Sequence, residues 1–73
     1  MKIHVPQHAE YRLVERGIDI DNIKKVISSP SESQTTNEGR IKVKKQLEDG
    51  RILTIIYVER NNQFVIITGY YEN

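Results

Sequence analysis

The sequence contains no cysteine. This absence excludes disulfide bonds, zinc sites built on thiolates and cysteine nucleophiles. It also removes any sign of secretion, so the cytoplasm is the expected compartment. The first residues contain no apolar run long enough for a signal peptide or a membrane span, and no membrane partner is expected. With 73 residues, the chain is expected to form one domain over residues 1–73, with a modest core.

Several motifs of known chemistry are also missing. There is no glycine-rich phosphate loop, no pair of carboxylates placed for acid–base catalysis and no Gly-x-Ser-x-Gly elbow, and no cofactor is expected. His4 and His8 have the spacing of a helical metal pair, but Pro6 disfavours helix at the residue before it and so places His4 outside the helix. No third ligand is nearby, and we expect no metal site. The net charge of +1 is too small to indicate nucleic-acid binding by the molecule as a whole.

Residues 8–18 are the most informative stretch, and we predict a helix from about residue 6 to residue 16. His8, Arg12 and Arg16 follow one another at intervals of four and drift only about 80° around the helix axis, so they form one row. Gly17 can take the left-handed conformation that ends a helix. An imidazole beside guanidiniums can exchange protons and bind phosphate; the alternative is a solvated basic face. The apolar residues on the other side are predicted to face a core: Ala9, Leu13 and Val14.

A second helix is predicted to follow at once. Asp19 is a good N-cap, and Pro30 ends the helix because the residue before a proline is disfavoured in the helical conformation. From residue 31 the apolar period changes to two, which predicts strands over residues 32–36, 40–47, 52–58 and 64–70. The expected fold class is α+β: two N-terminal helices packed on one face of a three- to four-stranded antiparallel β-meander. Two short helices cannot cover all the apolar strand residues, so the other face is expected to meet a partner.

Two strands carry candidate binding residues. Arg40, Lys42 and Lys44 alternate with apolar residues, which places them on one sheet face about 7 Å apart and suits the phosphates of a nucleic-acid backbone. The alternative is an exposed edge strand protected by its lysines. In the last strand, Thr68 and Tyr70 share one face, and a tyrosine there can stack on a base. The opposite face is assigned Val65, Ile67 and Gly69, where the glycine allows a helix to approach closely.

These pieces together resemble a family of small bacterial domains of unknown function. The resemblance rests on the pattern His-x-x-x-Arg-x-x-x-Arg-Gly-Ile at residues 8–18, the second helix ending near Pro30, the Gly39-Arg40 step and the closing Val-Ile-Ile-Thr-Gly-Tyr at residues 65–70. That family is similar to the RelE/ParE-type toxins and to the barnase-, EndoU- and colicin-like ribonuclease folds. The resemblance implies a RelE-like fold and, for many relatives, metal-independent cleavage of RNA. It implies a site at His8, the basic strand, Thr68 and Tyr70.

The resulting hypothesis is an endoribonuclease toxin paired with a neutralising antitoxin, in which a ribose 2′-hydroxyl attacks the adjacent phosphate. His8 is assigned as general base or acid, Arg12 and Lys44 hold the phosphate, and Tyr70 stacks on a base or assists proton transfer. The remaining RNA-binding residues are Arg16, Arg40, Lys42 and Thr68. Two alternatives need no catalytic histidine: a binding module that pairs with a partner or a second copy through its open sheet face, and a ParE-like inhibitor of a protein target.

Overall fold

The computed structural model describes residues 1–72, which form two helices and a five-stranded sheet. The elements in chain order are β1 (Ile3–His4), α1 (Gln7–Glu15), α2 (Ile20–Ser28), β2 (Glu32–Thr35), β3 (Ile41–Gln46), β4 (Ile52–Arg60) and β5 (Gln63–Glu72). In the sheet the order is β1-β5-β4-β3-β2, and only the β1–β5 pair is parallel. The α+β class is confirmed.

The predicted sheet was wrong in one respect, because a fifth strand makes it mixed. The lead-in at Ile3 and His4 pairs in parallel with Phe64 and Val65 of β5. A two-residue strand is too short to show an alternating pattern, and its parallel partner lies about sixty residues away along the chain. Nothing local therefore marks the first residues as part of the sheet.

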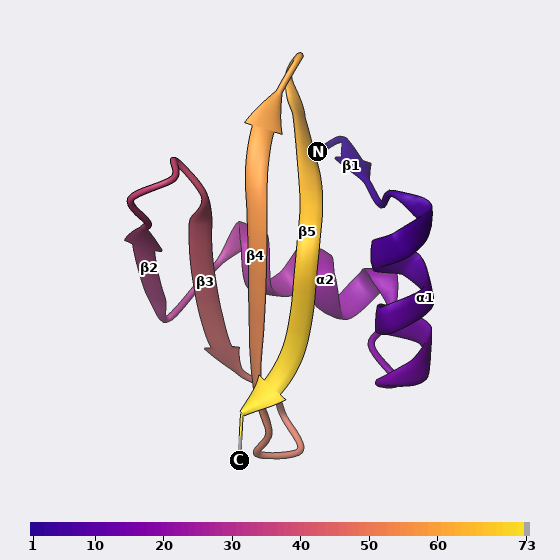
Figure 1. Ribbon diagram of the computed structural model, residues 1–73. Helices are drawn as coiled ribbons and strands as arrows, with labels where there is room; N and C mark the ends of the chain where they lie inside the picture. Colours follow the sequence, from indigo (N-terminus) through magenta and orange to yellow (C-terminus); the bar gives the residue numbers. More distant parts are fainter. Residues whose placement is uncertain (73) are drawn as a thin grey trace.

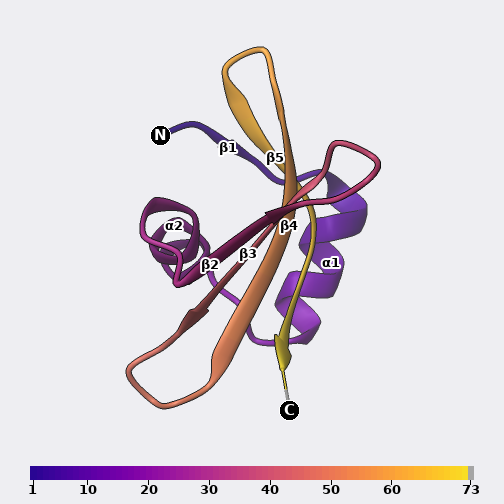
Figure 2. The same cartoon turned by 90° about the vertical axis from the view of Figure 1, so that its left-hand side faces the viewer.

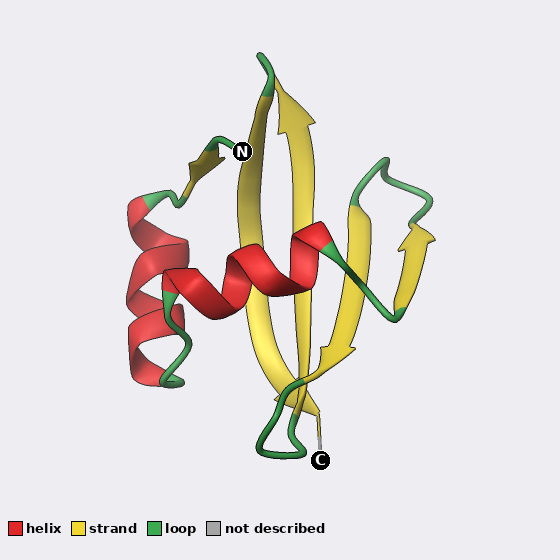
Figure 3. Ribbon diagram, turned by 180° about the vertical axis from the view of Figure 1, so that it is seen from behind, coloured by secondary structure: helices red, strands yellow, loops and turns green. Residues whose placement is uncertain are grey.

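The two helices cover different strands of the sheet, since α1 contacts β5 and α2 contacts β3 and β4. In Figure 1, α2 crosses behind the strands while α1 lies alongside β5 at the edge of the sheet. Figure 3 shows the same arrangement from behind, and Figure 2 shows α2 on one side of the twisted strands. Leu13 of α1 nevertheless packs against Gly69 and Ile55 in the same core as α2, so both helices contact the covered face, with α1 at its margin. α1 reaches this margin because β1 pairs only with the start of β5, which leaves the rest of that strand's edge open to α1.

The helix boundaries follow the local signals. Gly17 has a φ of 68°, and the backbone N–H groups of Gly17 and Ile18 donate to the carbonyls of Val14 and Leu13. This is the Schellman arrangement, in which a left-handed glycine satisfies the last carbonyls of a helix. The Asp19 carboxylate accepts a hydrogen bond from the Asn22 N–H at 2.9 Å and caps α2. The predicted end of α1 at Gly17 and the predicted start of α2 at Asp19 are both confirmed.

The core lies between α2, the inner side of α1 and the covered face of the sheet. Ala9 and Leu13 are buried as predicted, but Val14 is 72% exposed. Because α1 lies at the sheet edge, only one narrow side of it meets the core. The buried residues of the core cluster are Leu13, Ile18, Ile23, Val26, Ile27, Val43, Leu53, Ile55, Tyr57 and Ile66.

A β-bulge between β4 and β5 changes which residues of β5 face the core. Tyr57 pairs with Ile66, whereas the preceding Ile56 pairs with Thr68, so Ile67 is an extra residue. A bulge of this kind reverses the alternation of side chains along the strand. Ile66 is therefore buried and Val65 lies on the opposite face, which corrects the predicted assignment of Val65 and Ile67. Gly69, beyond the bulge, faces the core as predicted.

Candidate functional site

The sheet face opposite α2 is covered by no helix, and we call it the open face. Directly paired residues share a face of a sheet, so the ladder defines its members from the strands that flank the buried Val43 and Ile55. These are Lys42 and Lys44 from β3, Ile52, Thr54, Ile56 and Val58 from β4, and Val65, Thr68, Tyr70 and Glu72 from β5. Glu32 and Gln34 of the edge strand β2 continue this face.

Lys44 is the centre of the charged cluster on the open face. Its ammonium nitrogen donates to the Glu72 carboxylate at 3.0 Å and lies 3.8 Å from a carboxylate oxygen of Glu32. The hydrogen bond to Glu72 raises the pKa of Lys44, with smaller contributions from the charges of Glu72, Glu32 and Tyr70, while burial acts in the opposite direction. Lys44 is therefore a fixed cation at neutral pH, placed between acidic groups and close to a phenol.

Thr54 lies beneath this cluster and has an unsatisfied hydroxyl. It pairs with Lys44 on one side and with Tyr70 on the other, and it is fully buried although it belongs to the open face. Within residues 1–72 its hydroxyl oxygen has no hydrogen-bond partner. A buried hydroxyl without a partner destabilises the fold by about 1–3 kcal/mol. An unsatisfied hydroxyl of this kind indicates a possible ligand contact, because a ligand that formed a hydrogen bond with it would remove this destabilisation.

One margin of the open face is formed by α1. The Arg16 guanidinium donates to the Gly69 carbonyl at 2.7 Å and to the Thr68 hydroxyl at 3.4 Å. This contact gives a hydrogen-bond partner to a backbone carbonyl of β5 where β1 no longer pairs with that edge of the strand. Because the helical row of His8, Arg12 and Arg16 lies on one flank, this flank of α1 borders the open face.

The structure brings some of the predicted site residues together and not others. Lys44 and Tyr70 lie on either side of Thr54, and Arg16 contacts Thr68. His8 lies two helical turns from Arg16, roughly 12 Å further along the axis and away from the C-terminal half of β5. His8 and Arg12 are both exposed.

The remaining predicted cations lie on the side of the open face away from α1. Lys42 pairs with Ile56, and Arg40 directly precedes β3, where its backbone N–H donates to the Thr36 hydroxyl. Among residues 1–72, neither Arg12, Arg40 nor Lys42 lies within 4.0 Å of a carboxylate oxygen. In this part of the chain, cations without a carboxylate within 4.0 Å therefore lie on α1 and along β3, whereas Lys44 of β3 is paired with two carboxylates.

Sequence reasoning missed Glu72, Glu32 and Thr54. A signal for Glu72 was present, because it continues the alternation of Thr68 and Tyr70 along β5. Glu32 and Thr54 had no such signal. They meet Lys44 only through the β2–β3 and β3–β4 registers, which the sequence does not reveal.

The contact of Arg16 gives a first prediction. Arg16→Met retains the aliphatic stem but removes the donor to the Gly69 carbonyl, so the free energy of unfolding should fall by about 1 kcal/mol. Arg12→Met is the matched control on the same helix, and its stability should be unchanged because the Arg12 side chain makes no hydrogen bond within residues 1–72 and its backbone bond is unaffected. Urea denaturation of both variants measures the difference. Equal stability of the two variants would contradict the role of Arg16 at the sheet edge.

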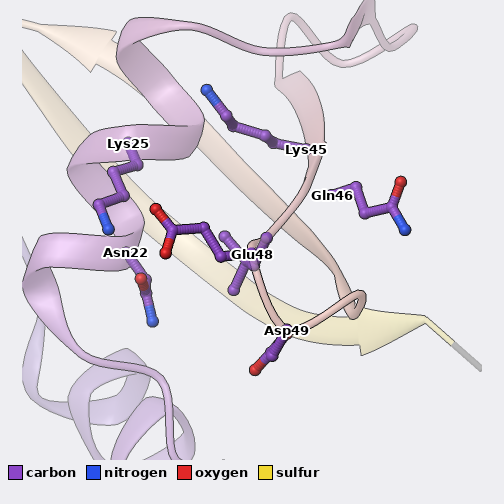
Figure 4. Close-up of a pocket in the computed structure, with 7 residues that line it drawn as sticks. Asn22, Lys25, Lys45, Gln46, Glu48 and Asp49 are labelled. Carbon is purple, nitrogen blue, oxygen red and sulfur yellow. The ribbon is translucent and has the colours of Figure 1, made fainter.

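Another hollow, of about 350 Å³, lies between α2 and the β3–β4 turn. Figure 4 shows Lys25 and Asn22 of α2 on one side and Lys45, Glu48 and Asp49 on the other. Lys45 donates to the Ser29 carbonyl at 3.1 Å. None of the predicted site residues lines this hollow, and its two lysines are balanced by two carboxylates.

The described residues contain no group of three or more His, Asp or Glu side chains that could hold a metal ion. No helix within residues 1–72 is long and apolar enough to cross a membrane.

The fold and the open face define a small α+β domain with a mixed sheet and a charged cluster on its uncovered side. Comparison with family models places it: the chain belongs to the family described as Domain of unknown function (DUF4258), whose model matches residues 6–71. No curated protein and no solved structure matches the chain.

Proposed function

We propose that the domain is a RelE-like, metal-independent endoribonuclease that binds single-stranded RNA on the open face, and that it is the toxin of a toxin–antitoxin pair. The observation that carries the proposal is the cluster of Lys44, Glu72 and Tyr70 above the buried Thr54 hydroxyl. A cation, a carboxylate and a phenol at one point of an open sheet can supply the charge stabilisation, general base and general acid that RNA transesterification uses.

The cluster supports a specific reaction. The Glu72 carboxylate takes the proton of a ribose 2′-hydroxyl, and the 2′-oxygen forms a bond to the adjacent phosphorus. The bond from phosphorus to the 5′-oxygen breaks, and that oxygen receives a proton from the Tyr70 hydroxyl. Lys44 stabilises the charge that develops on the phosphate. The products are a 2′,3′-cyclic phosphate and a free 5′-hydroxyl.

The RNA backbone is bound by the cations that have no nearby carboxylate among the described residues. Lys44 is neutralised by two carboxylates, so it attracts phosphate less than Arg40, Lys42 and Arg12 do. These three lie on both sides of the apolar residues Ile56 and Val58. A single strand could lay its bases on this apolar surface with its phosphates toward the margins. In this arrangement His8 contacts the RNA at the periphery and is not the general base.

The experiment that tests the proposal is cleavage of RNA by the purified chain in the presence of a chelator. Both free single-stranded RNA and messenger RNA on translating ribosomes are used as substrates. We expect products with 2′,3′-cyclic phosphate ends, and no cleavage where the 2′-hydroxyl at the cut site is replaced by a 2′-O-methyl group. A chain that cleaves neither substrate would contradict the proposal.

A second candidate function is a non-catalytic interaction module that binds a protein target, an antitoxin or a second copy through the open face. The observation that favours it is the apolar part of this face, formed by Ile52, Ile56, Val58 and Val65. Ile52 is 38% exposed. Sedimentation of the chain alone and with a co-encoded neighbour separates these outcomes. Self-association that is lost in Val58→Lys would favour the interaction module.

A further inference from the structure

A groove between α1 and α2 combines an apolar floor with acidic groups. It has a volume of about 390 Å³, and its apolar lining consists of Val5, Leu13, Val14, Ile18, Ile20 and Ile23. The polar side chains of its lining are the carboxylates of Glu10 and Asp19. Lysine, arginine and histidine are absent from the lining in the part of the chain that the structure describes. We call this the interhelix groove.

The apolar surface continues from the groove onto α1. A shallow hollow of about 480 Å³ is lined by Gln7, Glu10, Tyr11 and Val14, so Glu10 and Val14 belong to both hollows. Val14 is 72% exposed, Tyr11 is 69% exposed and Ile20 of α2 is 42% exposed. Adjacent large apolar side chains exposed in this way mark an interaction surface.

We propose that the interhelix groove binds a cationic amphipathic helix of a partner protein. The exposed aliphatic groups favour an apolar helix face, whose anchors repeat every three to four residues. The carboxylates favour lysine or arginine on the flanks of that helix. They disfavour RNA, which is an anion, and they disfavour a second copy in the same groove, because two sets of carboxylates would then face each other.

This groove is separate from the open face. Glu10, Leu13 and Val14 line the groove on one flank of α1, while Arg16, on the other flank, contacts Thr68 on the open face. The two flanks of α1 thus carry opposite charge. A partner in the interhelix groove would leave Lys44 and Tyr70 uncovered, so its binding does not depend on the proposed RNA chemistry.

The experiment uses two synthetic helical peptides with the same leucine face, one with lysines and one with glutamates on its flanks. Each is titrated into the isotope-labelled full chain and followed by NMR. We expect the lysine peptide to bind at least about tenfold more tightly, with shifts confined to α1, α2 and Val5. Val14→Glu should abolish this binding; Val14 is exposed, so the fold should persist, which circular dichroism checks.

A matched pair of charge reversals tests the acidic rim. Glu10→Lys should weaken binding of the lysine peptide about fivefold. Glu15→Lys makes the same change on the same helix but outside the groove, and binding should be unaffected. Equal affinity for both peptides, shifts centred on the open face, or equal effects of the two reversals would overturn the proposal. Self-association of the free chain that Val14→Glu abolishes would also overturn it, because a second copy would then occupy the groove.

Discussion

Glu72→Gln is expected to reduce RNA cleavage about a hundred- to ten-thousand-fold, the usual contribution of a general base. The substitution keeps the size of the side chain and a hydrogen-bond acceptor for Lys44, so the fold should be retained. The loss should appear in the rate of cyclic-phosphate formation and, on expression in cells, as relief of growth arrest. Glu32→Gln is the matched control, since Glu32 lies 3.8 Å from the same ammonium and at the edge strand. Its effect should be much smaller.

His8→Ala tests whether the general base for RNA cleavage lies on α1 or on the sheet. The sequence alone assigned His8 as the general base or acid, and that hypothesis predicts complete loss of cleavage. The position of His8 two turns from Arg16 and outside the Lys44 cluster predicts a loss of only a few-fold, through weaker RNA binding. If His8→Ala abolishes cleavage while Glu72→Gln is active, the base lies on α1 and the assignment to the sheet is wrong.

Gly69→Val is expected to lower the free energy of unfolding by about 1–3 kcal/mol through overpacking. A Cβ atom at Gly69 would lie 2.8 Å from Ile55 Cδ1 and 2.9 Å from Leu13 Cδ2, closer than carbon atoms approach without strain. Either α1 must move away from β5 or both side chains must change rotamer. The denaturant midpoint measures the loss.

Thr68→Val is the control for this prediction. It introduces the same residue at the neighbouring position of β5, on the open face, and removes only the long 3.4 Å contact to Arg16, whose 2.7 Å hydrogen bond to the Gly69 carbonyl remains. Its stability should change by less than about 0.5 kcal/mol, as is usual for surface substitutions. Unequal effects of the two valines would locate the cost in the contact between α1 and β5. Equal midpoints would contradict the close approach of Leu13 to Gly69.

Much of the open face was predictable, because strand alternation is a local property. The period of two placed Lys42 and Lys44 on one face of their strand and Thr68 and Tyr70 on one face of theirs, and the registers of the sheet bring both pairs to the open face. The alternation failed only where the bulge adds Ile67. A bulge depends on how two strands pair with each other, so it cannot be predicted from the sequence of either strand alone.

The sequence by itself determined the two helices, the boundary between them and the approximate positions of β2 to β5. Gly17 and Asp19 fix the boundary between the helices through hydrogen bonds that span no more than five residues, and such contacts form wherever their few residues occur together. The tertiary structure alone decided how distant elements meet: β1 pairs with β5, α1 takes the open edge of β5, and Glu72 reaches Lys44 from 28 residues away. These contacts depend on strand order and register, which arise from burial summed over the whole chain. The row of His8, Arg12 and Arg16 could therefore be predicted from the spacing of these residues. The distance of His8 from the Lys44 cluster could not, because it depends on how the strands assemble into the sheet.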